Sequence, residues 1–294
     1  MTIVAPPPPA PPTEPAPPPL TPGGRTAVRI ALVTVAAVVV AGTVAALALA
    51  GWATGAVRVV ADTTKLPADL RTLTIDTGDV ASAVRIVTDR DAREPTVSMR
   101  QVKSTRSTAD GLLVTGDADG TRVTVSERES SFLSWVRAGE LTVTLPPDLA
   151  RRMAVTVQQD DGVLIAQADL DQLTVHNTDG AIVLGGNARR VDVNTRDGRV
   201  VTQHPVAVSE SFVVRSGDGD VTVEFAEAAP RNTEIVSVDG DVSLALPRVG
   251  PYLVRTYGGS TQVRVPQTSD PARAVGQVTV SVRDGNATIR TLGN

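Results

Sequence analysis

The sequence predicts an all-β protein: a β-solenoid, that is, a parallel β-helix-like stack of coils of about 18–21 residues, preceded by one transmembrane α-helix and a disordered proline-rich tail. Three observations predict this order. Prolines crowd the first residues, a long uncharged apolar run follows, and a short Asp-Gly phrase then recurs at a near-constant spacing. A repeat near 20 residues is typical of stacked coils, because one coil alone cannot bury its apolar side chains.

The tail comprises residues 1–24, and eleven of the 21 prolines lie within residues 1–22. Proline fixes φ and has no amide hydrogen, so we expect an extended, polyproline-II-like segment without a core. Two interpretations stay open. The tail is either a solvated spacer or a ligand for the aromatic groove of a partner domain.

The transmembrane helix is predicted at residues 27–57, because residues 30–57 contain no charged side chain. A helix of about 20 apolar residues spans a bilayer core. Trp52 lies near the far end, at the depth where aromatic anchors collect. Small residues at 48–50 resemble a signal-peptide cleavage site, but the run exceeds the roughly 7–15 residues of a signal core. We therefore expect an uncleaved anchor.

The orientation prediction is a single-pass plasma-membrane protein with a cytoplasmic tail and an extracytoplasmic C-terminal domain. Arg25 and Arg29 precede the apolar run, and Arg58 and Lys65 follow it, so the positive-inside rule gives only mild support. Residues 58–66 are predicted to be a stalk between the membrane and the domain.

The solenoid domain is predicted at residues 67–294, with an irregular first part at 67–150 and regular coils at 151–292. Each regular coil has a glycine pair between two short segments rich in β-branched residues. Successive second glycines lie 18, 18, 21, 21, 19 and 26 residues apart. The pairs are Asp161-Gly162, Asp179-Gly180, Asp197-Gly198, Asp218-Gly219, Asp239-Gly240, Gly258-Gly259 and Asp284-Gly285.

These pairs are interpreted as structural corners. Glycine adopts the positive φ of a sharp turn, and the preceding aspartate can close an Asx-turn. A stack of β-hairpins is the competing interpretation, since Asp-Gly between strands is also a hairpin signal. The near-constant spacing and the short strands favour the solenoid. One helical turn is expected at residues 147–153.

The repeated corners and the segment "LTVTLPPDLARRMAVTVQQDDG" at 141–162 resemble a known family over about residues 66–292. It is the candidate-adhesin, β-strand-repeat domain of unknown function found in bacterial envelope proteins, often behind a single membrane helix. The resemblance implies a membrane-anchored β-solenoid and supplies no catalytic residue. Gly258-Gly259, which lacks the aspartate, and the last spacing of 26 residues depart from the pattern.

No catalytic, cofactor-binding or metal-ligating residue is assigned, and we expect a protein that is not an enzyme. The chain has no cysteine, His176 and His204 are isolated, and the aromatic content of 2% is low for a sugar groove. A net charge of −4 indicates no nucleic-acid partner. Arg189 and Arg190 are expected at a solvated corner. Alternatives for the aspartates are a glycosidase-like ladder or calcium ligands at 116–120 and 217–220.

One apolar cluster interrupts the polar pattern: Phe132, Leu133 and Trp135 lie between charged flanks. It is either a cap over the open end of the solenoid or a contact for a partner or a membrane surface.

The functional hypothesis is a non-enzymatic, membrane-anchored envelope protein with a binding, adhesive or sensing module. Its expected partners are the bilayer, through residues 30–57, and an envelope protein or cell-wall component. A scaffold that polymerises through its solenoid ends is the first alternative, and a carbohydrate-active enzyme is the second. The sequence leaves the oligomeric state open.

Overall fold

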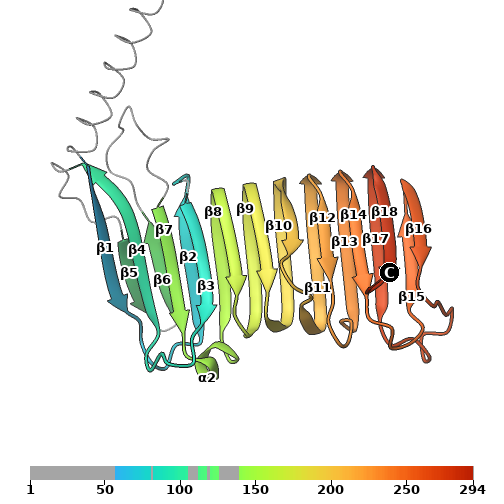
Figure 1. Ribbon diagram of the computed structural model, residues 1–294, viewed down its shortest axis with the longest axis horizontal. Coiled ribbons are helices and arrows are strands. Elements are labelled where there is room, and N and C mark those ends of the chain that lie inside the picture. The colour runs from blue at the N-terminus through green and yellow to red at the C-terminus, as the bar shows by residue number, and fades with distance from the viewer. Residues whose placement is uncertain (1–56, 81, 105–111, 118–119, 126–138, 294) are drawn as a thin grey trace, which may run out of the picture. The chain divides into compact units, whose positions relative to one another are not determined.

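The computed structural model describes residues 57–80, 82–104, 112–117, 120–125 and 139–293, whose strands stand side by side in one long row (Figure 1). The predicted tail, the apolar segment up to residue 56 and the cluster at Phe132, Leu133 and Trp135 lie outside these residues. Among the described residues, no helix is long and apolar enough to cross a membrane.

The described chain is almost entirely β-strand, in agreement with the predicted class. The strands of the first part are β1 (Val57–Lys65), β2 (Thr72–Gly78), β3 (Ser82–Thr88), β4 (Thr96–Ser104), β5 (Leu112–Asp117), β6 (Gly120–Val125) and β7 (Gly139–Leu145). The helical turn α2 (Pro147–Ala150) follows, as expected for residues 147–153. The remaining strands are β8 (Ala154–Gln167), β9 (Leu170–Gly185), β10 (Asn187–Thr202), β11 (Ala207–Asp218), β12 (Val221–Glu224), β13 (Asn232–Asp239), β14 (Val242–Leu246), β15 (Leu253–Tyr257), β16 (Ser260–Arg264), β17 (Gln277–Asp284) and β18 (Asn286–Thr291).

Each coil consists of two strand segments that meet at a glycine corner. We call the segments before the corner limb A and those after it limb B. Limb A runs in the order β5, β6, β2, the first halves of β8, β9 and β10, then β11, β13, β17 and β15. Limb B runs in the order β1, β4, β7, β3, the second halves of β8, β9 and β10, then β12, β14, β18 and β16.

The strands of neighbouring coils pair in parallel and in register. Val157, Val175, Val193, Val214 and Ile235 form one continuous row across five coils of limb A. The two strands that flank a corner glycine pair with the coils on either side, and not with each other. The structure therefore agrees with the solenoid-like stack and excludes the hairpin alternative for these coils.

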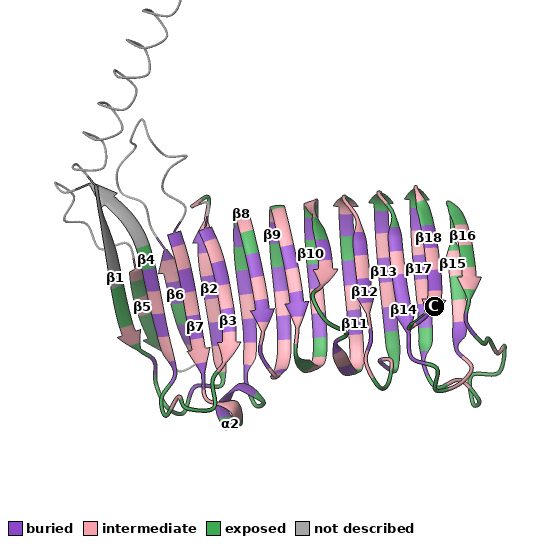
Figure 2. Cartoon of the chain, viewed as in Figure 1, coloured by how far each residue is buried: buried purple, intermediate pink, exposed green. Residues whose placement is uncertain are grey.

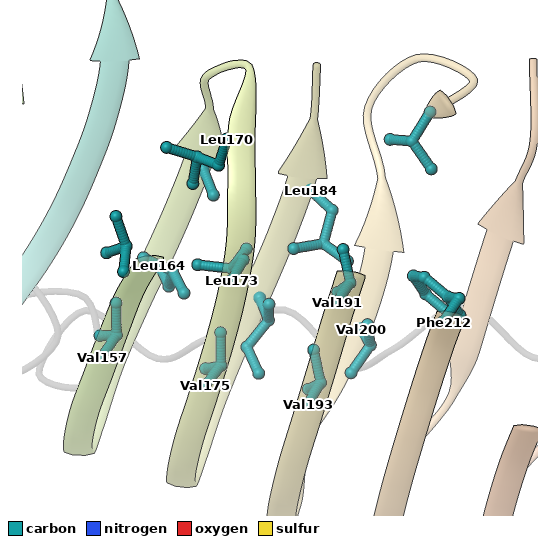
Figure 3. Close-up of a cluster of buried hydrophobic side chains, with 14 of the residues drawn as sticks. Val157, Leu164, Leu170, Leu173, Val175, Leu184, Val191, Val193, Val200 and Phe212 are labelled. Carbon is teal, nitrogen blue, oxygen red and sulfur yellow. The ribbon is translucent and has the colours of Figure 1, made fainter. Parts of the chain in front are cut away.

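The core lies between the two limbs, because alternate residues of every strand point inward (Figure 2). Figure 3 shows Val157, Val175 and Val193 in successive strands of this core. Phe212 and Phe225 are fully buried and make an edge-to-face contact with ring centroids 5.1 Å apart. Burial of each such side chain contributes roughly 1.5–3 kcal/mol, so the column of inward-facing residues is the main source of stability.

The N-terminal end departs from sequence order. The coil formed by β2 and β3 pairs with β8 on one side and with β6 and β7 on the other, so the first coil in sequence is not the outermost one. Residues 58–66, predicted to be a stalk, instead form strand β1 up to Lys65, and β1 pairs antiparallel with β4 over its whole length. The alternating Val and Thr residues of this segment suit a strand that extends the sheet.

The C-terminal end shows the same exchange. Strands β17 and β18 insert between the coil of β13 and β14 and the coil of β15 and β16. The chain must therefore cross back past one coil after β16, and residues 265–276 make this connection. This crossing explains the 26-residue spacing between Gly259 and Gly285. The coil that lacks the corner aspartate is thus the end coil of the stack.

Candidate functional site

The corner glycines form a ladder along one edge of the solenoid. Gly162, Gly180, Gly219, Gly240 and Gly285 have φ between 123° and 143°, a region that side chains rarely adopt. They also touch each other. A Cβ placed at Gly180 would lie 1.9 Å from the carbonyl oxygen of Gly162 in the preceding coil. Glycine is therefore required for both its backbone conformation and the closeness of the coils.

Gly198 is an exception among the corner residues, because its φ lies outside the left-handed region. A Cβ at Gly198 would still lie 2.6 Å from the carbonyl oxygen of Gly180. The close approach of neighbouring coils alone explains glycine at this position.

The corner aspartates stack in register beside these glycines, at the strand spacing of about 4.8 Å. The expected Asx-turns are not found at these positions: within the described part of the chain, none of the six side chains accepts a hydrogen bond. They are Asp161, Asp179, Asp197, Asp218, Asp239 and Asp284. No group of three or more histidine, aspartate or glutamate side chains in the described ranges has the arrangement of a metal site.

A second acidic row, one residue after the corner glycine, has a clear structural role. Asp220 Oδ1 accepts the backbone N–H of Asp241 at 3.1 Å, and Asp241 Oδ1 accepts the backbone N–H of Asn286 at 2.9 Å. Arg199 pairs with Asp220 at 3.1 Å. These carboxylates tie each coil to the next, which sequence reasoning missed because the partner lies one coil away.

Arg189 and Arg190, expected at a solvated corner, are in fact members of an ion-pair cluster. Arg189 contacts both Asp171 and Glu210 at 2.8 Å, and Arg190 contacts Glu210 at 2.8 Å. The hydrogen bond from Arg189 lowers the pKa of Asp171, and those from Arg190 and Arg189 lower the pKa of Glu210. The same bonds raise the pKa of Arg189. The cluster connects β9, β10 and the start of β11.

A polar hollow of about 490 Å³ lies on limb A near the corners of β2, β8, β9 and β10. We call it the amide hollow. Gln158, His176 and Asn194 occupy one in-register row within it. Its lining residues are Asp76, Gly78, Gln158, Gln159, Asp160, His176, Asn177, Thr178, Asn194 and Arg196.

The acidic groups of the amide hollow already have partners. Arg122 contacts Asp76 at 3.4 Å, and Thr178 donates to Asp160 at 3.2 Å. The remaining amides and His176 suit hydrogen bonds to a neutral polar group. His204, the other histidine, lies exposed in the connection after β10 and is not part of this hollow.

A larger hollow of about 640 Å³ lies at the base of the stack, where α2 and the loop between β3 and β4 meet (Figure 1). We call it the arginine hollow, because Arg90, Arg93, Arg151 and Arg152 line it. Asp148 is its one acidic lining residue. Sequence reasoning missed this hollow. Its two segments are about 60 residues apart in the chain and meet because β3 pairs with β7.

A family model described as Toastrack DUF4097 matches residues 71–292 of the chain. No curated protein sequence matches it. The family expected from the corner repeats is therefore confirmed by an independent match.

Similar solved structures come from gut bacteria. A candidate adhesin from Parabacteroides merdae has 10% identity and a TM-score of 0.45, with 79% of this chain and 96% of that chain covered. A candidate adhesin from Bacteroides fragilis has 10% identity and a TM-score of 0.42, with 80% and 97% covered. A candidate lipid binding protein from Parabacteroides distasonis has 9% identity and a TM-score of 0.44, with 78% and 96% covered.

Proposed function

Because the chain belongs to the Toastrack DUF4097 family, we propose that it is a non-enzymatic cell-envelope protein whose β-solenoid is a binding module attached to the plasma membrane by a single helix. The uncharged residues 30–57 supply the membrane segment. The domain from Val57 onward lies outside the cytoplasm, and the proline-rich tail lies inside.

The observation that carries the binding role is the pair of polar hollows on a rigid stack. In-register strands hold the side chains of the amide hollow and the arginine hollow at fixed positions, which lowers the entropy lost when a ligand binds. Their volumes of about 490 and 640 Å³ fall within the range of roughly 300–1,000 Å³ that is usual for ligand sites.

The test is crosslinking in intact cells, followed by mass spectrometry, with the full chain and with a version that lacks residues 1–24. We expect wall or envelope components among the captured material in both cases. Protein partners that depend on the tail would add a role in transmembrane signalling. Capture of cytoplasmic proteins by the solenoid domain would contradict the proposal, because that domain would then lie inside the cell.

A self-assembling scaffold is the second candidate, and the open edges favour it. Strands β15 and β16 each pair on one side only, so both present free backbone groups. Filaments that form from residues 57–294 as the concentration rises would support a scaffold. A monomer at high concentration in sedimentation velocity would exclude it and leave the binding role in place.

A further inference from the structure

The arginine hollow gathers four guanidinium groups on two rigid segments. Arg90 and Arg93 come from the loop between β3 and β4, and Arg151 and Arg152 follow α2. Pro95, Pro146 and Pro147 lie in the same lining and restrict the backbone of both segments. All four arginine side chains are exposed. The positive charge is therefore held in place before any ligand arrives.

The acidic groups nearby do not neutralise this charge. Asp148, the acid within the lining, is 3.9 Å from Arg151 and gives its backbone oxygen to Arg152 Nε at 2.9 Å. Glu94 pairs with Lys65 at 2.5 Å. Asp89 accepts the backbone N–H of Asp91 at 2.9 Å, and neither lines the hollow. The lining thus carries four positive charges against one negative charge.

Arg90 and Arg93 have no structural role in the described part of the chain, since they form no hydrogen bond or ion pair there. This contrasts with Arg189, which is held between Asp171 and Glu210. Guanidinium groups bind phosphate and carboxylate oxygens in pairs of parallel hydrogen bonds. The two unpaired arginines are therefore available for an anionic ligand.

The position of the hollow bears on the source of that ligand. Strand β1 begins at Val57, and its other end, Lys65, lies beside the loop that carries Arg90 and Arg93. Nine strand residues separate the two ends, a distance of about 30 Å. The hollow lies at the end of the strands away from Val57, the residue next to the apolar segment. An anion carried by a separate polymer reaches this place more readily than a lipid headgroup near Val57.

We propose that the arginine hollow binds a phosphate-bearing anionic polymer. Arg90 and Arg93 hold one phosphate group, and Arg151 and Arg152 hold another along the same chain. The proposal names the ligand class of the binding module and so rests on the proposed function. Its test uses purified protein, so it can fail while the envelope location holds, and the reverse is equally true.

The experiment measures the binding of short-chain inorganic polyphosphate to the full chain purified in a non-ionic detergent. The variant R90Q/R93Q removes two positive charges without touching any contact of the fold. We expect its affinity to fall at least about tenfold, because each lost charge-assisted hydrogen bond weakens binding by a comparable factor. R151Q/R152Q tests the second pair and is checked by circular dichroism, since Arg152 contacts α2.

The matched control is R255Q/R283Q, which removes the same charge from exposed arginines that have no partner in the described chain. Its affinity should equal that of the wild type. Equal losses in R90Q/R93Q and in the control would mean that polyphosphate responds only to net charge, and would overturn the site. Absence of wild-type binding would overturn it as well.

A second arm distinguishes a polymer from a lipid headgroup. Phosphatidylglycerol is mixed into the detergent micelles at increasing fractions, and polyphosphate binding is measured again. Unchanged binding supports a polymer ligand. Competition that is present in the wild type and lost in R90Q/R93Q would show that a membrane headgroup occupies the hollow, and would overturn the assignment to a polymer.

Discussion

The middle and the ends of the stack follow different rules. From β8 to β14, each coil pairs with the coil next to it in sequence, and the corner glycines lie in one row. At both ends the order is exchanged: β2 and β3 lie inside β6 and β7, and β17 and β18 lie inside β15 and β16. The repeat thus specifies the shape of a coil but not its place in the stack.

The end coil also has a different chemistry. Thr256 and Thr261 lie in register with Val280 and Ala287, which are buried in the neighbouring coil. A threonine at an inward-facing position satisfies its hydroxyl with water when no further coil covers it. The corner changes too, since Gly258 and Gly259 have φ of 70° and 43°. An exposed terminal coil needs a more polar face, as in other repeat proteins.

The largest effect expected from this difference is at the corners of the middle coils. In G180A, the new Cβ would overlap the backbone of Gly162, and no side-chain rotation can relieve the clash. The two coils must separate and lose ladder hydrogen bonds, so we expect a cost of at least about 5 kcal/mol and little folded protein. Urea unfolding of residues 57–294, followed by circular dichroism, measures the change.

Gly116 in β5 provides the control from the N-terminal end. A Cβ there would meet only Thr121 Oγ1, at 3.7 Å, and the φ of Gly116 is not in the left-handed region. G116A should change the free energy of unfolding by less than about 1 kcal/mol. If G180A were as stable as G116A, the close contact of the glycine corners would not matter for the fold.

The second prediction compares cores. Phe212 is fully buried and contacts Phe225, so F212A should lower the free energy of unfolding by about 3–5 kcal/mol. Val263 in the end coil faces inward but is only partly buried. V263A should cost less than about 1 kcal/mol, because water already reaches this position. Similar losses in the two variants, measured by urea unfolding, would show that the end coil packs as tightly as the middle.

These differences explain which features could be predicted from the sequence. The valine alternation around Asp179-Gly180 is local, so the coil, its corner and the family followed from it. The exchanged order did not, because every coil presents the same in-register edge and β17 matches β13 as well as β15 does. Only the long connection at residues 265–276 indicated a crossing.

The candidate sites were less accessible to sequence reasoning. Corner aspartates such as Asp218 recur and draw attention, yet the side chains with measurable contacts are those one position away, such as Asp220. The arginine hollow brings Arg90 beside Arg151 through pairing of β3 with β7. No local motif marks two segments that meet only through the stack.

The third prediction concerns acid stability and the cluster of the middle coils. The pKa of Asp171 is lowered from 3.8 and that of Glu210 from 4.5, so the charged forms stabilise the fold. This contribution is fully present above those values and is lost as the pH falls through the lowered ones. D171N should therefore flatten the stability loss below about pH 4 and cost up to about 1 kcal/mol at neutral pH, since the pair is partly exposed. Thermal melting between pH 3 and pH 7 tests this.

The matched control for D171N lies at the N-terminal end. Glu94 pairs with Lys65, and both side chains are more than half exposed. E94Q should keep the acid profile of the wild type, because water screens such a pair almost completely. If E94Q and D171N flattened the profile equally, the middle cluster would have no special weight.

The smallest effect on stability is expected at the end coil, where the change should instead alter association. T256V/T261V replaces the two inward-facing threonines with the residue type of the middle coils, and the free energy of unfolding should change by less than about 1 kcal/mol. The variant leaves an uncovered apolar face beside the free edges of β15 and β16, so residues 57–294 should associate as the concentration rises. Sedimentation velocity measures this association. A variant that stays monomeric under conditions in which the wild type is monomeric would show that the threonines do not protect the end, and that the backbone geometry around Gly258 and Gly259 is the more important barrier.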